Sequence, residues 1–309
     1  MDENQLTLKK VSSKIGITLL LVMIVTYIVQ IITSFLITWL IPDAVSEPWY
    51  VWSMTVISLY LVAFPIYLKI MKGIPDFHIN CEKNYSVTEM IILVFICLAG
   101  TYLCNIISVG LNMLIGQLKG SAVINPLEMA VNSSNITYTF IVACIMAPII
   151  EEIMFRKVII NKLVGYGEKL AIIVSSFAFA LFHGNLYQIL YAFVLGVIFA
   201  HITIKSGTIK YAVILHIIIN TFGSVIFPYL ALSSNEYIAG ITFLILLMSI
   251  LAGAILFVIK RNDLFPKLNE VPEIEGQDKP KISTALLSDG MVAFWMISVI
   301  LIIFATFLS

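Results

Sequence analysis

Long apolar stretches constrain this sequence more than any other feature, because they recur along almost the whole chain. A helix needs about 20 apolar residues to cross the hydrocarbon core of a bilayer. We predict nine such spans, near 15–41, 49–70, 88–115, 137–161, 170–185, 187–204, 208–232, 237–259 and 290–308. Only 12% of the residues are charged, about half the fraction of a soluble domain. The sequence therefore predicts an all-α, polytopic integral membrane protein whose apolar surface is covered by lipid.

The spans divide into three predicted parts. Residues 1–135 contain the first three spans, residues 136–232 contain four spans that carry most of the intramembrane ionisable residues, and residues 233–309 contain the last two. The segment 261–289 is the one long polar insert, with three prolines and charges of both signs. We predict a loop or a short surface helix there rather than a separate domain.

Lysine and arginine predict the orientation, since they concentrate in cytoplasmic loops. With the N-terminus inside, 17 of the 18 basic residues fall in or beside predicted cytoplasmic segments, and only Lys119 falls outside them. This asymmetry predicts a cytoplasmic 261–289 segment and, with nine spans, an external C-terminus. We expect a multi-pass protein of a cell membrane, and of a bacterial cytoplasmic membrane in particular.

The fourth predicted span places two carboxylates side by side in an apolar helix, where each ionisable group costs a few kcal/mol. Glu152 and Arg156 have the i,i+4 spacing that favours an ion pair. Successive helical residues point about 100° apart, so Glu151 has no partner on its own helix and is the better candidate for a reactive group. Pro148 removes a backbone hydrogen bond just before the pair and predicts a kink.

Two further motifs place histidines inside apolar spans. Phe179 and His183 are one helical turn apart near the end of the fifth span, and His216 and Asn220 are one turn apart in the seventh. Counted from the cytoplasmic anchors Lys162, Lys205 and Lys169, Glu151 and His216 lie roughly 16 Å deep and His183 roughly 21 Å deep. The three side chains can therefore meet within the membrane, provided that Arg156 is buried against Glu152.

Each feature also has a structural interpretation. A single membrane histidine commonly packs or forms a hydrogen bond, and paired glutamates at a helix end are commonly solvated. For His201, four residues before Lys205, we expect a structural role at the interface, and for His78 a solvated loop position. The three motifs together, at similar depth in three spans, favour a shared site.

At these residues the sequence resembles the CPBP or Abi family of intramembrane peptidases, which includes the type II CAAX prenyl endopeptidases. The family's three motifs correspond here to Glu151-Glu152-x-x-x-Arg156, Phe179-x-x-x-His183 and His216-x-x-x-Asn220. The resemblance covers about residues 140–224. One departure is Lys157, where many members have glycine, and we expect it to be tolerated.

The resemblance implies hydrolysis of a peptide bond by an activated water. Glu151 with His183 would hold and deprotonate the water, and His216 with Asn220 would donate hydrogen bonds to the developing oxyanion. Glu152 and Arg156 would orient these groups. The resemblance also implies a substrate contact for Phe179, which completes the predicted site.

A metal ion is the alternative to direct activation of water. Glu151, His183 and His216 form a His₂Glu set that would suit Zn²⁺ with one open position, although the soluble-zinc signature H-E-x-x-H is absent. The sequence leaves the choice open and slightly favours a metal-free site. Serine and aspartyl intramembrane mechanisms are disfavoured, because neither G-x-S-x-G nor an intramembrane aspartate pair is present.

Two other function classes remain open at this point. A proton-coupled transporter could use intramembrane Glu and His, but we find no inverted repeat across the two halves. A member of the same fold could act in immunity or as a scaffold without catalysis. The expected partners of a peptidase are membrane lipid and a peptide or membrane-protein substrate, with no nucleic acid.

Overall fold

The computed structural model describes residues 7–269 and 280–307, and all regular structure in those ranges is helical. Eight helical stretches are long and apolar enough to cross a membrane, namely Leu8–Leu40, Tyr50–Met71, Val87–Lys119, Ile136–Tyr166, Leu186–Ser206, Lys210–Ala231, Glu236–Leu264 and Asp289–Phe307. This confirms the all-α, multi-pass membrane class. The orientation of the N-terminus stays a prediction.

The first part of the chain forms one long helix, a broken second span and an oblique third one. Its elements are α1 (Leu8–Leu40), η1 (Ala44–Ser46), α2 (Tyr50–Thr55), η2 (Val56–Ala63), α3 (Phe64–Met71), α4 (Val87–Lys119) and α5 (Pro126–Asn132). The core part contains α6 (Ile136–Thr139), η3 (Phe140–Met146), α7 (Ala147–Glu152), η4 (Ile153–Ile159), α8 (Ile160–Leu163), η5 (Val164–Tyr166), α9 (Glu168–Phe182), α10 (Leu186–Ser206), α11 (Lys210–Thr221), η6 (Phe222–Ile226) and α12 (Phe227–Ala231). The chain closes with α13 (Glu236–Leu264), α14 (Ile282–Leu286) and α15 (Asp289–Phe307).

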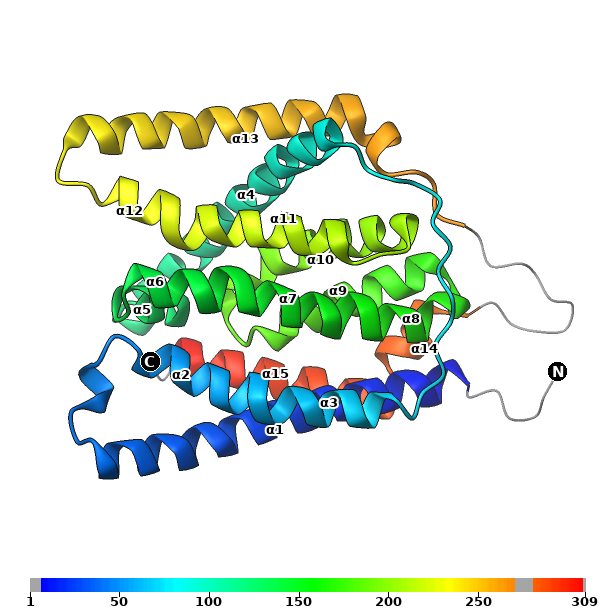
Figure 1. Cartoon of the computed structure of the whole chain (residues 1–309), viewed down its shortest axis with the longest axis horizontal. Coiled ribbons are helices and arrows are strands. Elements are labelled where there is room, and N and C mark those ends of the chain that lie inside the picture. Colours follow the sequence, from blue (N-terminus) through cyan, green and yellow to red (C-terminus); the bar gives the residue numbers. More distant parts are fainter. Residues whose placement is uncertain (1–6, 270–279, 308–309) are drawn as a thin grey trace, which may run out of the picture.

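The core helices lie between two outer groups (Figure 1). On one side α1 packs against α15 and against η2 and α3, and on the other α4 packs against α10, α11 and α13. The large apolar side chains of α1 and α13 are mostly exposed, among them Phe35, Trp39, Phe243 and Val258. Such surfaces are stable only where lipid covers them, so the structure agrees with the composition.

Proline explains most of the irregular helix turns. Among the described residues, η2, η3, η4 and η6 are π-helical, and three of them end two residues before Pro65, Pro148 or Pro228. A proline has no N–H and its ring collides with the carbonyl four residues earlier. A π turn, which pairs each N–H with the carbonyl five residues back, makes room for the ring. The kink predicted at Pro148 is therefore a widened turn directly before Glu151 and Glu152.

The fifth predicted span is a helix but is too short to cross the bilayer. α9 has 15 residues and is about 22 Å long, against a hydrocarbon thickness of about 30 Å. Its end is sharp because Gly184 adopts a left-handed φ of +60° and Asn185 caps the next helix by accepting a hydrogen bond from the Tyr187 N–H. α9 and α10 thus form a hairpin, and His183 lies at its turn.

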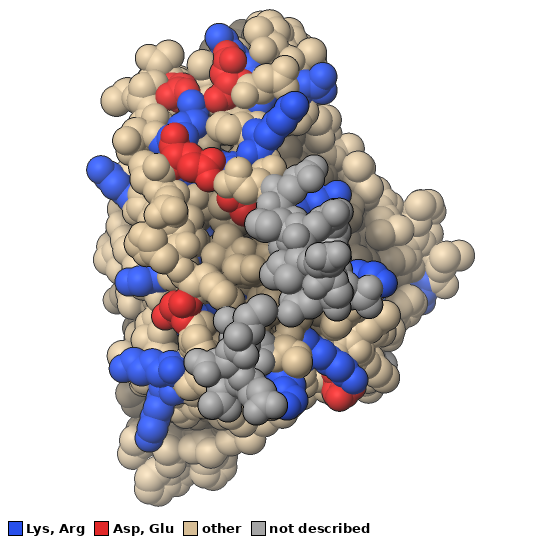
Figure 2. All heavy atoms as spheres, turned by 90° about the vertical axis from the view of Figure 1, so that its right-hand side faces the viewer, with Lys and Arg blue, Asp and Glu red and all other residues tan. Residues whose placement is uncertain are grey.

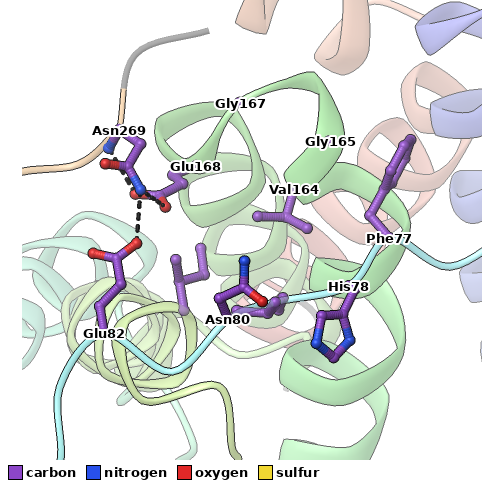
Figure 3. Close-up of a pocket in the computed structure, with 11 residues that line it drawn as sticks. Phe77, His78, Asn80, Glu82, Val164, Gly165, Gly167, Glu168 and Asn269 are labelled. Carbon is purple, nitrogen blue, oxygen red and sulfur yellow. Dashed lines mark hydrogen bonds between the residues drawn. The ribbon is translucent and has the colours of Figure 1, made fainter.

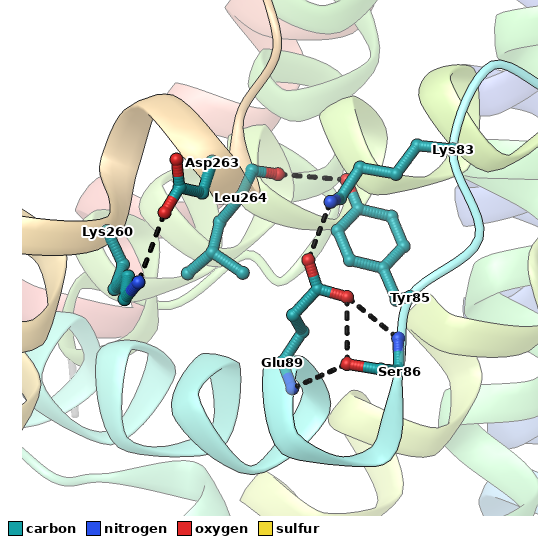
Figure 4. Close-up of polar contacts among 7 residues, drawn as sticks. All are labelled: Lys83, Tyr85, Ser86, Glu89, Lys260, Asp263 and Leu264. Carbon is teal, nitrogen blue, oxygen red and sulfur yellow. Dashed lines mark hydrogen bonds and ion pairs between the residues drawn. The ribbon is translucent and has the colours of Figure 1, made fainter.

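Charged side chains define one end of the bundle. Figure 2, which faces the end where α1 begins, shows lysine, arginine, aspartate and glutamate side chains spread over that face. At the same end a capping box of Ser86 and Glu89 starts α4, Lys83 pairs with Glu89 at 2.6 Å, and the Tyr85 hydroxyl donates to the Leu264 carbonyl at 3.0 Å (Figure 4). These contacts join the beginning of α4 to the end of α13.

The polar insert contains a short helix, one of the two structures that the sequence predicts for it, and its first residues extend α13. α13 continues to Leu264, five residues beyond the predicted end of the eighth span, and α14 is a short helix within the insert. The Leu264 side chain is buried, which explains why the helix extends past the charged Lys260 and Arg261. Residues 270–279 of the insert lie outside the described residues.

Candidate active site

The paired glutamates lie on α7, a short α-helical segment between the π segments η3 and η4. Glu152 Oε2 and Arg156 Nε are 3.1 Å apart, and both side chains are fully buried. The predicted i,i+4 ion pair is therefore present, and the burial of Arg156 meets the condition under which the three motifs lie at one depth. π segments of this kind occur frequently at functional sites.

Aromatic rings surround the Arg156 guanidinium. Its Cζ lies 4.1 Å from the ring centre of Phe179, 5.7 Å from that of Phe199 and 5.9 Å from that of Phe155. Among the described residues none of its nitrogen atoms has a hydrogen-bond partner, because the close Nε approach to Glu152 is poorly directed. The cation is thus held by one carboxylate and by aromatic faces, an attraction that reaches about 2 kcal/mol when desolvated.

His216 lies between the two glutamates. Its Nδ1 is 2.9 Å from Glu152 Oε1, and its Nε2 is 3.7 Å from Glu151 Oε2. An ionised carboxylate only accepts hydrogen bonds, so Nδ1 donates to Glu152. In a neutral imidazole Nε2 is then the acceptor, and it faces Glu151. The distance of 3.7 Å is too long for a direct hydrogen bond. Glu151 therefore lies beside His216 without a direct hydrogen bond, and its pairing with His183, which the resemblance implies, remains a prediction.

His183 has its ring fixed at the turn between α9 and α10. Nδ1 lies 2.8 Å from the carbonyl oxygen of Phe179, and because a carbonyl can only accept, Nδ1 must donate. Nε2 is thereby left as the acceptor. Glu151 is near enough to interact electrostatically with this ring. Both histidines of the site thus donate from Nδ1 within the protein, and in their neutral forms Nε2 is the acceptor.

Phe179 connects the three motifs. Its ring packs edge-on against His183 at 4.7 Å and against His216 at 5.9 Å, in addition to its contact with Arg156. Only 2% of its surface is exposed. This placement gives Phe179 a packing role within the site, and the substrate contact implied by the resemblance remains a prediction.

Asn220 binds backbone rather than the other motif residues. Its Nδ2 donates to the Ala143 carbonyl at 3.0 Å. Ala143 lies five residues before Pro148, and the neighbouring Ala147 N–H donates to Val142, also five residues back. Pro148 has no N–H to continue this register, so Asn220 supplies the missing donor. The amide has a second N–H, and the predicted oxyanion contact remains a prediction.

Sequence analysis missed two hydroxyls that support this region. Tyr67 on α3 donates to the Met154 carbonyl and Ser175 on α9 donates to the Phe155 carbonyl, each at 2.8 Å. Both carbonyls belong to η4, the segment that carries Arg156, and both donors are buried. The sequence does show that Tyr67 and Ser175 lie within apolar spans, where a hydroxyl needs a hydrogen-bond acceptor. The sequence does not show which acceptor it finds.

The geometry does not provide the donor set of a metal site. Within residues 7–269 and 280–307, no three His, Cys, Asp or Glu side chains converge closely enough to hold a metal ion. Glu151, His183 and His216 therefore do not fit the Zn²⁺ alternative as arranged here. We derive no step through a metal.

A second buried cation lies at the charged end of the bundle. Lys205 Nζ is 2.9 Å from both Glu82 and Glu168, and the Asn269 amide donates to the same two carboxylates at 2.7 and 2.9 Å (Figure 3). We call these four residues the end clasp. The hydrogen bond from Lys205 holds the pKa of Glu82 below its ordinary value. A cavity of about 300 Å³ adjoins the clasp, away from the three motifs.

The two other histidines lie near this end. His78 is exposed and lines the cavity beside the clasp (Figure 3). His201 is 9% exposed and packs edge-on against Phe265. These positions agree with the solvated and structural roles expected from the sequence.

Residues 133–222 match the family described as Type II CAAX prenyl endopeptidase Rce1-like. The matched segment is less than a third of the chain and contains all three motifs. The match supports the predicted family over these residues. No curated protein and no solved structure matches the chain.

Proposed function

We propose that this chain, whose residues 133–222 match the Type II CAAX prenyl endopeptidase Rce1-like family, hydrolyses peptide bonds of a substrate held at or within the membrane. The observation that carries the proposal is the row of acid and base groups formed by Glu152, His216 and Glu151, with contacts of 2.9 and 3.7 Å. Glu152 fixes the tautomer of His216 in the way that a carboxylate orients a catalytic imidazole.

Glu151 is the proposed general base. Its side chain is 21% exposed, whereas those of Glu152 and Arg156 are fully buried and that of His216 is 5% exposed. It is therefore the group of the four that a water molecule and a substrate reach most readily. Glu151 Oε2 and His216 Nε2 both accept, so one water can donate a hydrogen to each of them.

Hydrolysis then needs one proton transfer in each direction. Glu151 takes a proton from the water as its oxygen bonds to the peptide carbonyl carbon. When the carbon–nitrogen bond breaks, the proton returns to the leaving nitrogen, giving a carboxylic acid and an amine. His183 is the second imidazole with Nε2 available, and Asn220 keeps one amide N–H for the oxyanion. This division differs from the one implied by the resemblance, since His216 rather than His183 shares the water with Glu151.

The family name and the membrane location define the substrate class. We propose a peptide or a membrane-protein tail that is anchored in or beside the lipid, and a prenylated C-terminal peptide is one member of this class. The predicted host membrane, the bacterial cytoplasmic membrane, is part of the same proposal. A lipid anchor would bring the scissile bond to the depth of Glu151 by confining the substrate to the bilayer.

Purified protein tests the proposal directly. Wild type and Glu151→Gln are incubated in H₂¹⁸O with a proteome-derived peptide library and with CAAX peptides that are farnesylated or unmodified. Hydrolysis by wild type alone, with one ¹⁸O in each new carboxyl terminus, supports it. Activity that is lost on chelation and restored by added metal would show that a metal ligand set forms in a state other than this one. Equal product from both proteins, or none from wild type on any substrate, contradicts the proposal and favours a non-catalytic member of the fold.

A further inference from the structure

An open groove beside the beginning of α1 combines a basic end with an apolar floor. Its volume is about 660 Å³, and it is lined by Lys9, Lys10, Ser13, Lys14, Ile17, Thr18, Leu21, Ile70 and Asp289. The lining comes from α1, from the last turn of α3 and from the beginning of α15. No contact of the candidate active site involves these side chains.

The order of residue types along α1 gives the groove its chemical character. Lys10, Lys14, Ile17 and Leu21 follow the i, i+4, i+7 and i+11 spacing of a single helix face. The two lysines lie at the end of the bundle, and the two apolar side chains lie further along the helix, where 55% of Ile17 and 38% of Leu21 is exposed. One stripe therefore changes from cationic to apolar in about 16 Å of helix.

Three lysines face one carboxylate at the basic end. Asp289 pairs with Lys9 at 3.3 Å, but both side chains are largely exposed, and such pairs contribute little stability. Lys14 is held by a 3.0 Å hydrogen bond to the Gly73 carbonyl and keeps two of its three N–H donors. The basic end thus presents a net positive charge with donors still available for an anion.

The wall of the groove is fixed by a close helix crossing. A Cβ atom on Gly16 would lie 2.4 Å from the backbone of Gly290, so the crossing of α1 and α15 requires glycine. The Gly290 N–H donates to Ser13 Oγ at 3.0 Å. These contacts hold the beginning of α15 against α1, so the groove has a rigid side.

We propose that this groove binds an anionic phospholipid, with its phosphate at Lys9, Lys10 and Lys14 and one acyl chain along Ile17, Leu21 and Ile70. A basic headgroup site continued by an apolar channel matches the two ends of such a lipid. A zwitterionic lipid lacks the net charge that the lysines complement, and a soluble anion leaves the apolar part of the groove uncovered. The site is independent of the proposed peptidase activity.

Lipid titration of the detergent-purified protein tests this site. Binding is measured by thermal shift and by native mass spectrometry, with dioleoyl phosphatidylglycerol, dioleoyl phosphatidylcholine of the same chain length, and inorganic phosphate. We expect saturable binding of the phosphatidylglycerol alone, weakened by added salt. The Lys9→Gln/Lys10→Gln variant should bind it about 25-fold more weakly, at roughly fivefold per lysine.

A matched variant separates a site from general surface charge. Lys157 and Lys210 are exposed lysines on η4 and α11, so Lys157→Gln/Lys210→Gln removes the same charge elsewhere and should keep wild-type affinity. Ile17→Ser should weaken binding of the lipid without creating a response to phosphate. The proposal fails if both lipids bind equally, if phosphate alone reproduces the shift, or if the two lysine double variants lose affinity equally.

Discussion

Among the described residues, two lysine or arginine side chains are buried to 0% exposure, and their surroundings differ. Lys205 of the end clasp is hydrogen-bonded to Glu82 and has Glu168 at the same 2.9 Å distance, and Asn269 joins those carboxylates from a segment more than 60 residues away. Arg156 has one ion pair and three aromatic rings. Among the described residues its nitrogen atoms have no hydrogen-bond partner.

The difference indicates what each cluster does. A polar network in which each charge has a partner fixes the segments that it joins. The end clasp, in which Lys205 is buried and Glu82 is 40% exposed, joins the loop before α4, the beginning of α9 and the chain after α13. Unsatisfied buried polar groups are costly, and where they persist they need an explanation such as a catalytic role. The unsatisfied nitrogen atoms of Arg156 lie near Glu151, a carboxylate that stays partly exposed. This contrast supports the proposal that the clasp has a structural role and the Arg156 cluster a chemical one.

The largest expected effect follows from removing the proposed base. Glu151→Gln keeps the shape of the side chain but cannot accept a proton, so turnover should fall by about 10²–10⁴. Its thermal stability should stay near wild type, because Glu151 has no direct ion pair on its own helix. His183→Ala should also abolish turnover. The measurement is a peptide-cleavage assay paired with thermal unfolding in detergent.

An exposed carboxylate elsewhere provides the control for this comparison. Glu128 on α5 is exposed, and Glu128→Gln should leave turnover and stability unchanged. Wild-type activity in both Glu151→Gln and His183→Ala would remove the chemical role from this cluster.

The second effect concerns the buried ion pair. Arg156→Ala leaves the buried charge of Glu152 without its ion-pair partner, which costs roughly 3–5 kcal/mol of unfolding free energy, and it should lower activity as well. Calorimetry in detergent measures the first quantity. The combination of lost stability and lost activity distinguishes Arg156 from Glu151, whose replacement should affect activity alone. An unchanged melting temperature would mean that Arg156 is solvated in the folded protein.

The third effect separates two roles of Asn220. Loss of an oxyanion donor slows turnover by about 10²–10³, whereas loss of the hydrogen bond to Ala143 leaves a carbonyl unsatisfied and costs about 1–3 kcal/mol of stability. We expect both changes in Asn220→Ala. In a Pro148→Ala background the backbone regains an N–H that can bond to Ala143, so the stability loss should become smaller. Equal losses in the two backgrounds would contradict the capping role.

The smallest effect belongs to the end clasp. The pKa of Glu82 is lowered by its bond to Lys205, so its stabilising contribution is complete above the ordinary carboxyl pKa of 4.5 and is lost as pH falls below it. Melting temperature measured from pH 7 to pH 3 should therefore fall less steeply at the acid end in Glu82→Gln than in wild type. Turnover at pH 7 should change little. Parallel pH profiles would show that Glu82 is not coupled to the fold.

Much of the fold follows from periodicity and composition, because lipid selects helices of a definite length. The sequence therefore predicts the membrane-spanning helices well, and eight of the nine predicted spans are long enough to cross a membrane. The exception is α9, which ends early because Gly184 and Asn185 form a turn. Hydropathy averages over about 20 residues and does not detect that turn. The π segments depend on local backbone sterics at Pro65, Pro148 and Pro228, which an apolar pattern does not encode.

The site shows the same division between local and tertiary information. The Glu152–Arg156 pair is local to one helix and could be predicted from spacing alone. The approach of His216 to Glu151 and the bonds from Tyr67 and Ser175 to η4 depend on how four helices pack. Spacing along the chain carries no information about such contacts between helices, so it could not predict that His216 lies beside Glu151.

Comparison of peptide termini in cells tests the central claim most directly. Membranes and culture medium from cells with wild-type protein and with Glu151→Ala are analysed by quantitative peptidomics and terminal proteomics, with Glu128→Gln as the control. The account predicts new carboxyl and amino termini, from membrane proteins or membrane-bound peptides, that are present with wild type and with Glu128→Gln and absent with Glu151→Ala. Identical sets of termini in all three strains, at equal protein levels, would contradict it.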